Sequence, residues 1–142
     1  MGLHACIMGA NIISYKKNGI NYGMCCAWAM QTDYDKMLCL LGSQSVTGKN
    51  IEKGDIIGIS SLNKNQEKIA FQLGENHSDE CNKFVNISYT LDDSAILIND
   101  ASTMMKVEVI DIIHLDKIEA DNLIYCKVLS YTENKKAFYE YK

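Results

Sequence analysis

The sequence predicts a mainly β fold, a closed or nearly closed barrel with two short helices, formed by a single domain over residues 1–142. Many short segments either alternate apolar and polar residues or are continuously apolar, as strands are. Only two segments have a helical pattern, and no linker or internal repeat divides the chain. With 142 residues and 47% hydrophobic content, the chain can form its own core without disulfide or metal support.

The N-terminal part predicts three strands. Segments 10–16 and 22–30 flank Asn18-Gly19, the strongest short signal for a hairpin turn. Residues 36–42 form a continuous apolar run that ends in Gly42 and has no capping residue before it, which indicates a buried third strand.

Two helices are predicted in the middle of the chain. The first runs from Ser45 to Lys53, with Ser45 as N-cap and Gly54 as the left-handed residue at its end, and a strand over 55–61 follows. The second begins after segment 63–66. Its apolar positions Ile69, Ala70 and Leu73 share one face, and Gly74 stops the pattern.

The C-terminal half predicts strands. Residues 75–83 are polar and lack periodicity, so we expect a loop that can cover a site. The strand-like segments beyond it are 86–90, 95–98, 104–115, 123–132 and a short one at 137–141.

Charge and composition exclude several functions. The net charge of -4 gives no basic surface for nucleic acid. No apolar run is long enough to cross a bilayer and the first residues lack signal-peptide features, so we expect a cytoplasmic protein without membrane contact. No histidine pair has metal-binding spacing, so no metal site is predicted. No glycine-rich nucleotide-binding loop occurs either.

The six cysteines show no Cys-x-x-Cys spacing, which argues against a zinc or iron site. Cys6, Cys39 and Cys126 lie among apolar residues and are predicted to be packed in the core as reduced thiols. Cys25 and Cys26 point to opposite sides of a strand, so a disulfide between them is discounted.

The strand over 22–30 has two unlike faces. Side-chain alternation places the bulky residues Tyr22, Met24, Cys26, Trp28 and Met30 on one face and the small residues Gly23, Cys25, Ala27 and Ala29 on the other. The bulky face is expected in the core, and alternation favours the core for Trp28 too, with stacking near a bound ring as the alternative. The small face lets a flat heterocycle approach the backbone, or it packs closely against another element.

The turn that opens the first helix is a candidate phosphate site. A Ser-x-Thr turn offers hydroxyl donors, backbone amides and the positive end of the helix dipole. Ser45 and Thr47 are the main candidates, with Gln44 and Lys49 as further donors, because the chain contains no arginine. The alternative is ordinary capping by Ser45 with Thr47 exposed.

Segment 21–51 resembles the flavin reductase-like family of FMN-binding split barrels. The corresponding run in that family reads roughly Asn-Gly-Met-Thr-Ala-Ser-Trp, followed by Ser-x-Thr ahead of a short helix, and the residues of this chain that match are Gly23, Met24, Trp28, Ser45 and Thr47. Weaker similarities follow in the same order: Lys83-Phe84 after a helix, an alternating strand near Val107, and Asp121-Asn122 before a long strand. The resemblance implies a six-stranded Greek-key split β-barrel that binds FMN.

The resemblance also implies the residues that contact the flavin. They are Met24, Cys25, Cys26, Ala27, Trp28, Gln44, Ser45, Thr47, Lys49, Lys83 and Asn122. Cys25 and Ala27 replace hydroxyl side chains of the family, so the ring edge must be bound mainly by main-chain groups. Gln44 stands where a basic residue is frequent, and Asn122 stands in place of a histidine and cannot transfer a proton.

The implied function is an FMN-binding flavoprotein oxidoreductase that takes a hydride from NAD(P)H and passes electrons to free flavin or a redox partner protein. No catalytic side chain is predicted, because the flavin carries the chemistry. Two alternatives stay open: an electron-transfer flavoprotein that does not react with nicotinamide, and a split-barrel binding module without enzymatic activity. A homodimer is expected, with Tyr131, Phe138, Tyr139 and Tyr141 as candidate interface aromatics.

Overall fold

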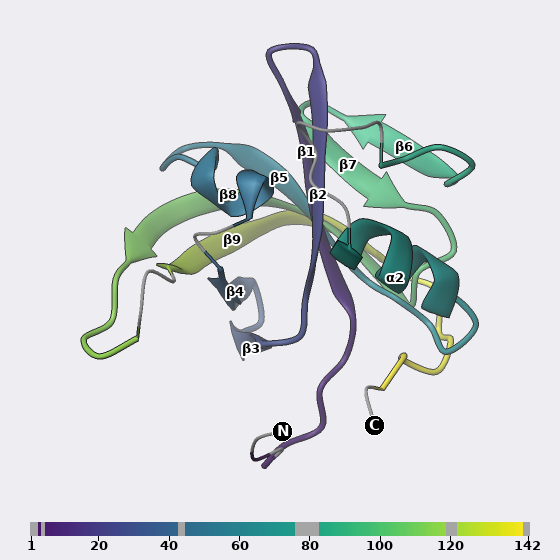
Figure 1. The fold of residues 1–142 in the computed structure, drawn as a ribbon, viewed down its shortest axis with the longest axis horizontal. Coiled ribbons are helices and arrows are strands. Elements are labelled where there is room, and N and C mark those ends of the chain that lie inside the picture. The colour runs from purple at the N-terminus through teal and green to yellow at the C-terminus, as the bar shows by residue number, and fades with distance from the viewer. Residues whose placement is uncertain (1–2, 4, 43–44, 76–82, 119–121, 141–142) are drawn as a thin grey trace.

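One antiparallel sheet connects all the strands of the computed structural model, which describes residues 3, 5–42, 45–75, 83–118 and 122–140 (Figure 1). The strands are β1 (Asn11–Lys17), β2 (Ile20–Cys26), β3 (Ala29–Asp33), β4 (Lys36–Leu41), β5 (Ile56–Ser61), β6 (Tyr89–Asp92), β7 (Ala95–Ile98), β8 (Thr103–Ile113) and β9 (Asn122–Glu133). Their order in the sheet is β3-β4-β9-β8-β5-β1-β7-β6, and β2 pairs with β1. The helices are α1 (Val46–Lys49) and α2 (Glu67–Glu75). The mainly β prediction with two short helices is therefore confirmed.

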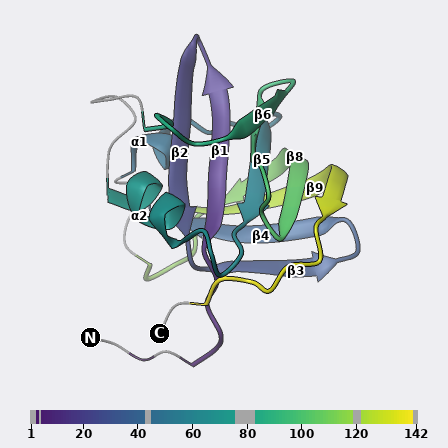
Figure 2. The same cartoon turned by 90° about the vertical axis from the view of Figure 1, so that its right-hand side faces the viewer.

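Two hydrophobic clusters lie on opposite faces of β1. Ile13 and Tyr15 pack in one cluster with side chains of β4, β5, β8 and β9, whereas Ile12 packs in the other beneath α2 and β7. Neighbouring residues point to opposite faces of a strand, so β1 is buried on both sides and contributes side chains to both clusters. Figure 2 shows both helices on the side of the sheet where β2 runs.

The hairpin at the start of the chain forms as predicted. Asn18 and Gly19 both adopt positive φ, 53° and 77°, as a tight two-residue turn between twisted strands requires. The predicted strands at 36–42, 55–61 and 95–98 also correspond to β4, β5 and β7. α2 forms over the predicted apolar face, with Ala70 and Leu73 almost fully buried.

The strand predicted over 22–30 is wrong beyond Cys26. β2 ends at Cys26, and the chain bends before β3 begins at Ala29. The alternation of the two faces therefore breaks at the bend, and Trp28 and Met30 are each 60% exposed instead of buried in the core. The Trp28 indole nitrogen lies 3.1 Å from the Met8 sulfur.

Other boundaries differ for local reasons. α1 ends at Lys49, well before the predicted Lys53, and Gly54 takes its positive φ in the turn that leads to β5. β6 begins at Tyr89 because a turn with Asn86 at positive φ precedes it. Among the described residues of segment 137–141, Phe138 forms only an isolated bridge with Asn63 in place of a strand. The predicted loop at 75–83 falls largely outside the described residues.

No helix among the described residues combines the length and apolar character needed to span a bilayer.

Candidate functional site

Three segments that carry predicted site residues meet where β4 ends. The Leu40 amide donates to the Trp28 carbonyl at 2.9 Å, and the Cys26 thiol lies 3.3 Å from the Leu40 carbonyl. On the other side of β4, Leu41 pairs with Asn122, the first residue of β9. The end of β2 and the start of β9 therefore flank the point from which the chain turns toward α1.

Ser45 caps α1 as predicted. Its hydroxyl oxygen accepts the Gly48 amide at 2.8 Å, and its own amide donates to the Gly42 carbonyl at 3.1 Å. The Ser45 hydroxyl also lies 3.3 Å from the Met24 sulfur, which connects the cap to β2. A side chain at position 48 has no room, since its Cβ would lie 2.8 Å from the Gly42 carbonyl oxygen.

Thr47 is buried, with 1% of its surface exposed, so the alternative in which it is merely exposed is wrong. Its carbonyl accepts a hydrogen bond of 2.5 Å from the Tyr15 hydroxyl, and the Tyr15 ring stacks on Tyr22 with the centroids 5.1 Å apart. Burial raises the pKa of Tyr15 well above its ordinary range, so this hydroxyl keeps its proton.

Lys17 holds the other end of α1. Its ammonium donates to the Asn50 carbonyl at 2.8 Å and pairs with Glu52 and Asp55 at 2.7 and 3.0 Å. Partial burial lowers the pKa of Lys17, but the two carboxylates outweigh this effect and raise it above its usual value. Neither Tyr15 nor Lys17 is among the site residues predicted from the sequence. The available signal was their spacing of two residues, which places both on one face of β1.

The small face of β2 is closely packed at its centre. A Cβ at Gly23 would lie 2.6 Å from the Phe84 ring, and a Cβ at Gly74 of α2 would lie 3.6 Å from the Cys25 Cβ. Around Gly23 and Cys25 the second interpretation of this face, packing against another element, is therefore correct. Lys83 is 4% exposed, and its ammonium donates to the Gly23 carbonyl at 2.6 Å.

The remaining predicted residues are placed as follows. Ala27 is half-buried in the bend between β2 and β3, Lys49 is exposed on α1, and Gln44 lies outside the described residues. The sequence placed Asn122 in a turn, whereas it is the first residue of β9.

The core thiols are packed as a group. Cys39 and Cys126 are fully buried as predicted, whereas Cys6 is exposed, contrary to prediction. A hydrogen bond from Cys39 lowers the pKa of Cys26, and the same bond together with burial raises that of Cys39. Burial raises the pKa of Cys126 to about 12. Cys6, Cys26, Cys39 and Cys126 are free thiols, and none of the described residues form a cluster suited to a metal ion.

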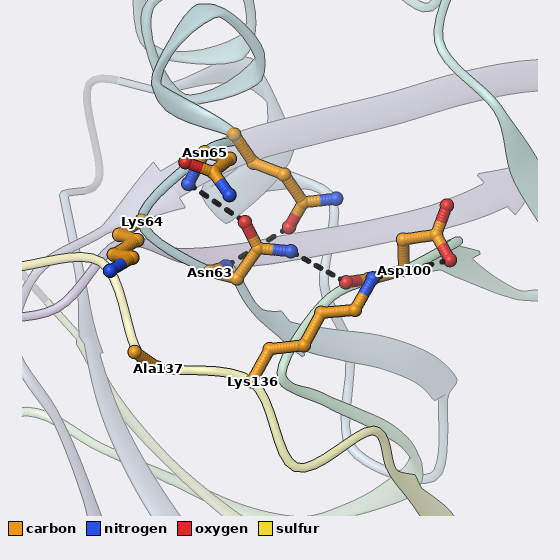
Figure 3. Close-up of a pocket in the computed structure, with 7 residues that line it drawn as sticks. Asn63, Lys64, Asn65, Asp100, Lys136 and Ala137 are labelled. Atoms are coloured by element: carbon orange, nitrogen blue, oxygen red, sulfur yellow. Dashed lines mark hydrogen bonds and ion pairs between the residues drawn. The ribbon is translucent and has the colours of Figure 1, made fainter.

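Two hollows lie elsewhere, and neither is lined by a described residue of this site. One, of about 600 Å³, lies at the start of α2 (Figure 3). Its polar groups bond one another. The side-chain nitrogen Nδ2 of Asn63 donates to the Asp100 carbonyl at 2.8 Å, and the Lys136 ammonium lies 3.6 Å from the Asp100 carboxylate.

The second hollow is a groove of about 540 Å³ along β3, β8 and β9. It is lined in part by the candidate interface aromatics Tyr131, Phe138 and Tyr139, of which the first two are more than 60% exposed. Tyr141, the fourth candidate, lies outside the described residues.

Comparisons with known proteins give a consistent result. A family model described as the flavin reductase like domain matches residues 3–141. Curated protein sequences give no match to the chain.

Solved structures share the fold at low sequence identity. The NADH:FAD oxidoreductase SgcE6 of Streptomyces globisporus C-1027 superimposes with a TM-score of 0.81 at 15% identity, covering 96% of this chain and 87% of that one. An FMN-binding protein of Thermus thermophilus superimposes with a TM-score of 0.80 at 12% identity, covering 93% of this chain and 74% of that one. Flavoredoxin from Methanosarcina acetivorans superimposes with a TM-score of 0.78 at 10% identity, covering 96% of this chain and 80% of that one. The split-barrel prediction is therefore confirmed.

Proposed function

Because the chain belongs to the flavin reductase-like domain family, we propose that it is an FMN-binding flavoprotein oxidoreductase that takes a hydride from NADH or NADPH. One observation carries the proposal: the end of β2, the start of β9 and the capped turn into α1 meet at the end of β4. The names of the similar structures, an NADH:FAD oxidoreductase and an FMN-binding protein, support the same chemistry.

The turn into α1 fits a phosphate monoester. Ser45 and Thr47 supply hydroxyl groups, and Lys49 and Gln44 supply a positive charge and an amide. The constraint on Gly48 keeps the turn tight, so the backbone can approach an anion closely. Lys83 adds a buried positive charge beside β2. These groups select a flavin with a terminal phosphate, and we therefore propose FMN as the cofactor.

The ring would lie toward the end of β2. Because the small face is filled around Gly23 and Cys25, the proposed contacts are main-chain groups of Cys25, Cys26 and Ala27 on the edge of β2 opposite the one paired with β1. Met24 and Trp28 flank this segment, and Asn122 can donate a side-chain amide to the ring edge. The bound flavin would supply the hydride-accepting group, so the protein's task is to hold and orient the ring.

We also propose a homodimer formed through the groove along β3, β8 and β9. Tyr131 and Phe138 expose 64% and 61% of their surface there, which leaves aromatic area for a second copy to cover. Sedimentation of the wild type and of Phe138→Ser tests this proposal. A monomeric wild type contradicts it, and a dimer that Phe138→Ser dissociates supports it.

The proposed function is tested by adding FMN to the purified protein, recording the visible spectrum and then adding NADH or NADPH under anaerobic conditions. Bound flavin that bleaches supports the oxidoreductase. Bound flavin that keeps its colour supports an electron carrier reduced by a partner protein. The absence of any bound FMN supports a binding module and contradicts the proposal.

A further inference from the structure

Two side chains of β1 reach across to α1. Tyr15 and Lys17 share one face of the strand, and each donates a hydrogen bond to a main-chain carbonyl of the α1 segment, Tyr15 to Thr47 and Lys17 to Asn50. The partners are 32 and 33 residues apart in sequence, so these contacts belong to the tertiary fold and not to the local turn.

α1 depends on these outside donors because it is so short. The last four carbonyls of any helix have no partner within it, and α1 contains only four residues. The carbonyls of Val46, Thr47 and Asn50 receive their hydrogen bonds from the side chains of Asn50, Tyr15 and Lys17. Two of these three hydrogen bonds therefore come from β1.

Both donors are themselves held in place. Tyr15 is 2% exposed and stacks on Tyr22 with an interplanar angle of 21°. Lys17 is fixed by Glu52 and by Asp55, and the Asp55 carboxylate also accepts the Glu52 amide at 2.8 Å. A donor that cannot move resists displacement of the group it binds.

We propose that Tyr15 and Lys17 are positioning residues that hold the α1 turn in the geometry needed to bind the cofactor phosphate. This inference rests on the proposed function, since it assumes that Ser45 and Thr47 bind that phosphate. Tyr15 has the larger role because its target is Thr47 itself and because it is buried beyond the reach of water, so no solvent molecule can replace the lost donor.

The test compares the dissociation constants of FMN and riboflavin, which differ only in the phosphate, for the wild type and three variants. Tyr15→Phe keeps the stacked ring and removes the donor. Lys17→Met removes the ammonium. Tyr22→Phe is the matched control, since it deletes the hydroxyl of the other ring in the same stack, which is not among the donors to α1 in the described residues.

For Tyr15→Phe we expect FMN to bind about tenfold more weakly, the order expected for one hydrogen bond, with riboflavin changed less than about twofold. Lys17→Met shows the same selectivity with a smaller loss, and it carries the test if Tyr15→Phe does not fold. Tyr22→Phe binds both flavins as the wild type does.

The positioning role is overturned if Tyr15→Phe and Lys17→Met lose FMN and riboflavin affinity equally, or lose neither. In that case normal FMN binding by the wild type still leaves the proposed function standing. A wild type that binds FMN no better than riboflavin contradicts the phosphate site and with it the positioning role, whereas the oxidoreductase proposal is decided by whether bound flavin bleaches with NADH or NADPH.

Discussion

The two helices of this protein are held in place in different ways. At the start of α2, side-chain oxygens accept hydrogen bonds from backbone amides. The Asn65 backbone amide donates to the Asn63 side chain at 2.8 Å, and the Asn63 backbone amide donates to the Gln66 side chain at 3.0 Å. At α1, one side chain, Ser45, caps the start, and the donors from β1 serve the carbonyls instead. Polar groups at the start of α2 therefore bond one another, whereas α1 is held by its Ser45 cap together with donors from β1.

This difference distinguishes a structural turn from a candidate binding turn. Both precede a helix and both carry amide and lysine side chains, but only the turn into α1 also carries the hydroxyl groups of Ser45 and Thr47. The hollow at α2 has neighbouring groups that already bond one another, which makes it a stabilising network. The turn into α1 has its own local bonds through Ser45, and it is held in addition by Tyr15 and Lys17 from β1, which lie outside it.

The largest expected effect comes from adding one methyl group to a glycine of each helix. Gly48→Ala places a Cβ 2.8 Å from the Gly42 carbonyl oxygen, whereas Gly74→Ala in α2 makes only an ordinary contact of 3.6 Å with Cys25. Overpacking against backbone should lower the free energy of unfolding by about 3 kcal/mol in Gly48→Ala and abolish tight FMN binding. Gly74→Ala should be neutral or stabilising by up to about 1 kcal/mol. Urea unfolding and FMN titration measure both, and equal behaviour of the two variants would contradict the comparison.

Thr47→Val should weaken FMN binding by about 1 to 3 kcal/mol, the range for a buried hydrogen bond to a charged group. The substitution keeps the shape of this buried side chain and removes its hydroxyl. Fluorescence titration with FMN measures the change, and riboflavin affinity serves as the control. An unchanged FMN dissociation constant would remove Thr47 from the proposed site.

Asn63→Ala tests the other turn. Asn63 is 5% exposed, and its side chain bonds both the Asp100 carbonyl and the Asn65 amide, so its loss should lower the free energy of unfolding by about 2 kcal/mol. FMN affinity should stay within about twofold of the wild type, because this network lies away from β4 and α1. A selective loss of FMN binding without a change in stability would place a ligand function at α2.

Alkaline pH gives the smallest effect. The pKa of Tyr15 is raised from its ordinary value of 10.0, chiefly by burial, so the folded chain keeps a proton that the unfolded chain loses. The resulting stability is present below pH 10 and decreases as the pH rises, by about 1 kcal/mol per pH unit for one proton. The raised pKa of Lys17 acts in the same direction. Unfolding followed from pH 9 to 11 should therefore show a shallower decline in Tyr15→Phe than in the wild type, and parallel declines would contradict this assignment.

The sequence predicted local features well where a residue type has a strong preference for one local conformation or hydrogen bond. Asn18-Gly19 specifies a hairpin because few residues tolerate positive φ, and Ser45 specifies a helix start because its hydroxyl accepts a backbone amide. The apolar face of α2 follows from its periodicity.

Features that depend on distant segments were not predictable in the same way. Alternation assigned Trp28 to the core because nothing in the local pattern reveals that the chain bends after Cys26. The hydrogen bond from Tyr15 to Thr47 arises from tertiary packing. The space beside Gly23 is occupied by the ring of Phe84, which lies 61 positions further along the chain. Family resemblance supplied the candidate ligand, which periodicity and composition alone do not contain.

A crystal structure of the protein grown with FMN tests the central claim most directly. The account predicts the phosphate within hydrogen-bond distance of Ser45 and the first turn of α1, with the ring edge against the main chain of Cys25 to Ala27. FMN bound at the start of α2 or in the groove beside Tyr131, with the turn into α1 occupied by the protein's own side chains, would contradict it.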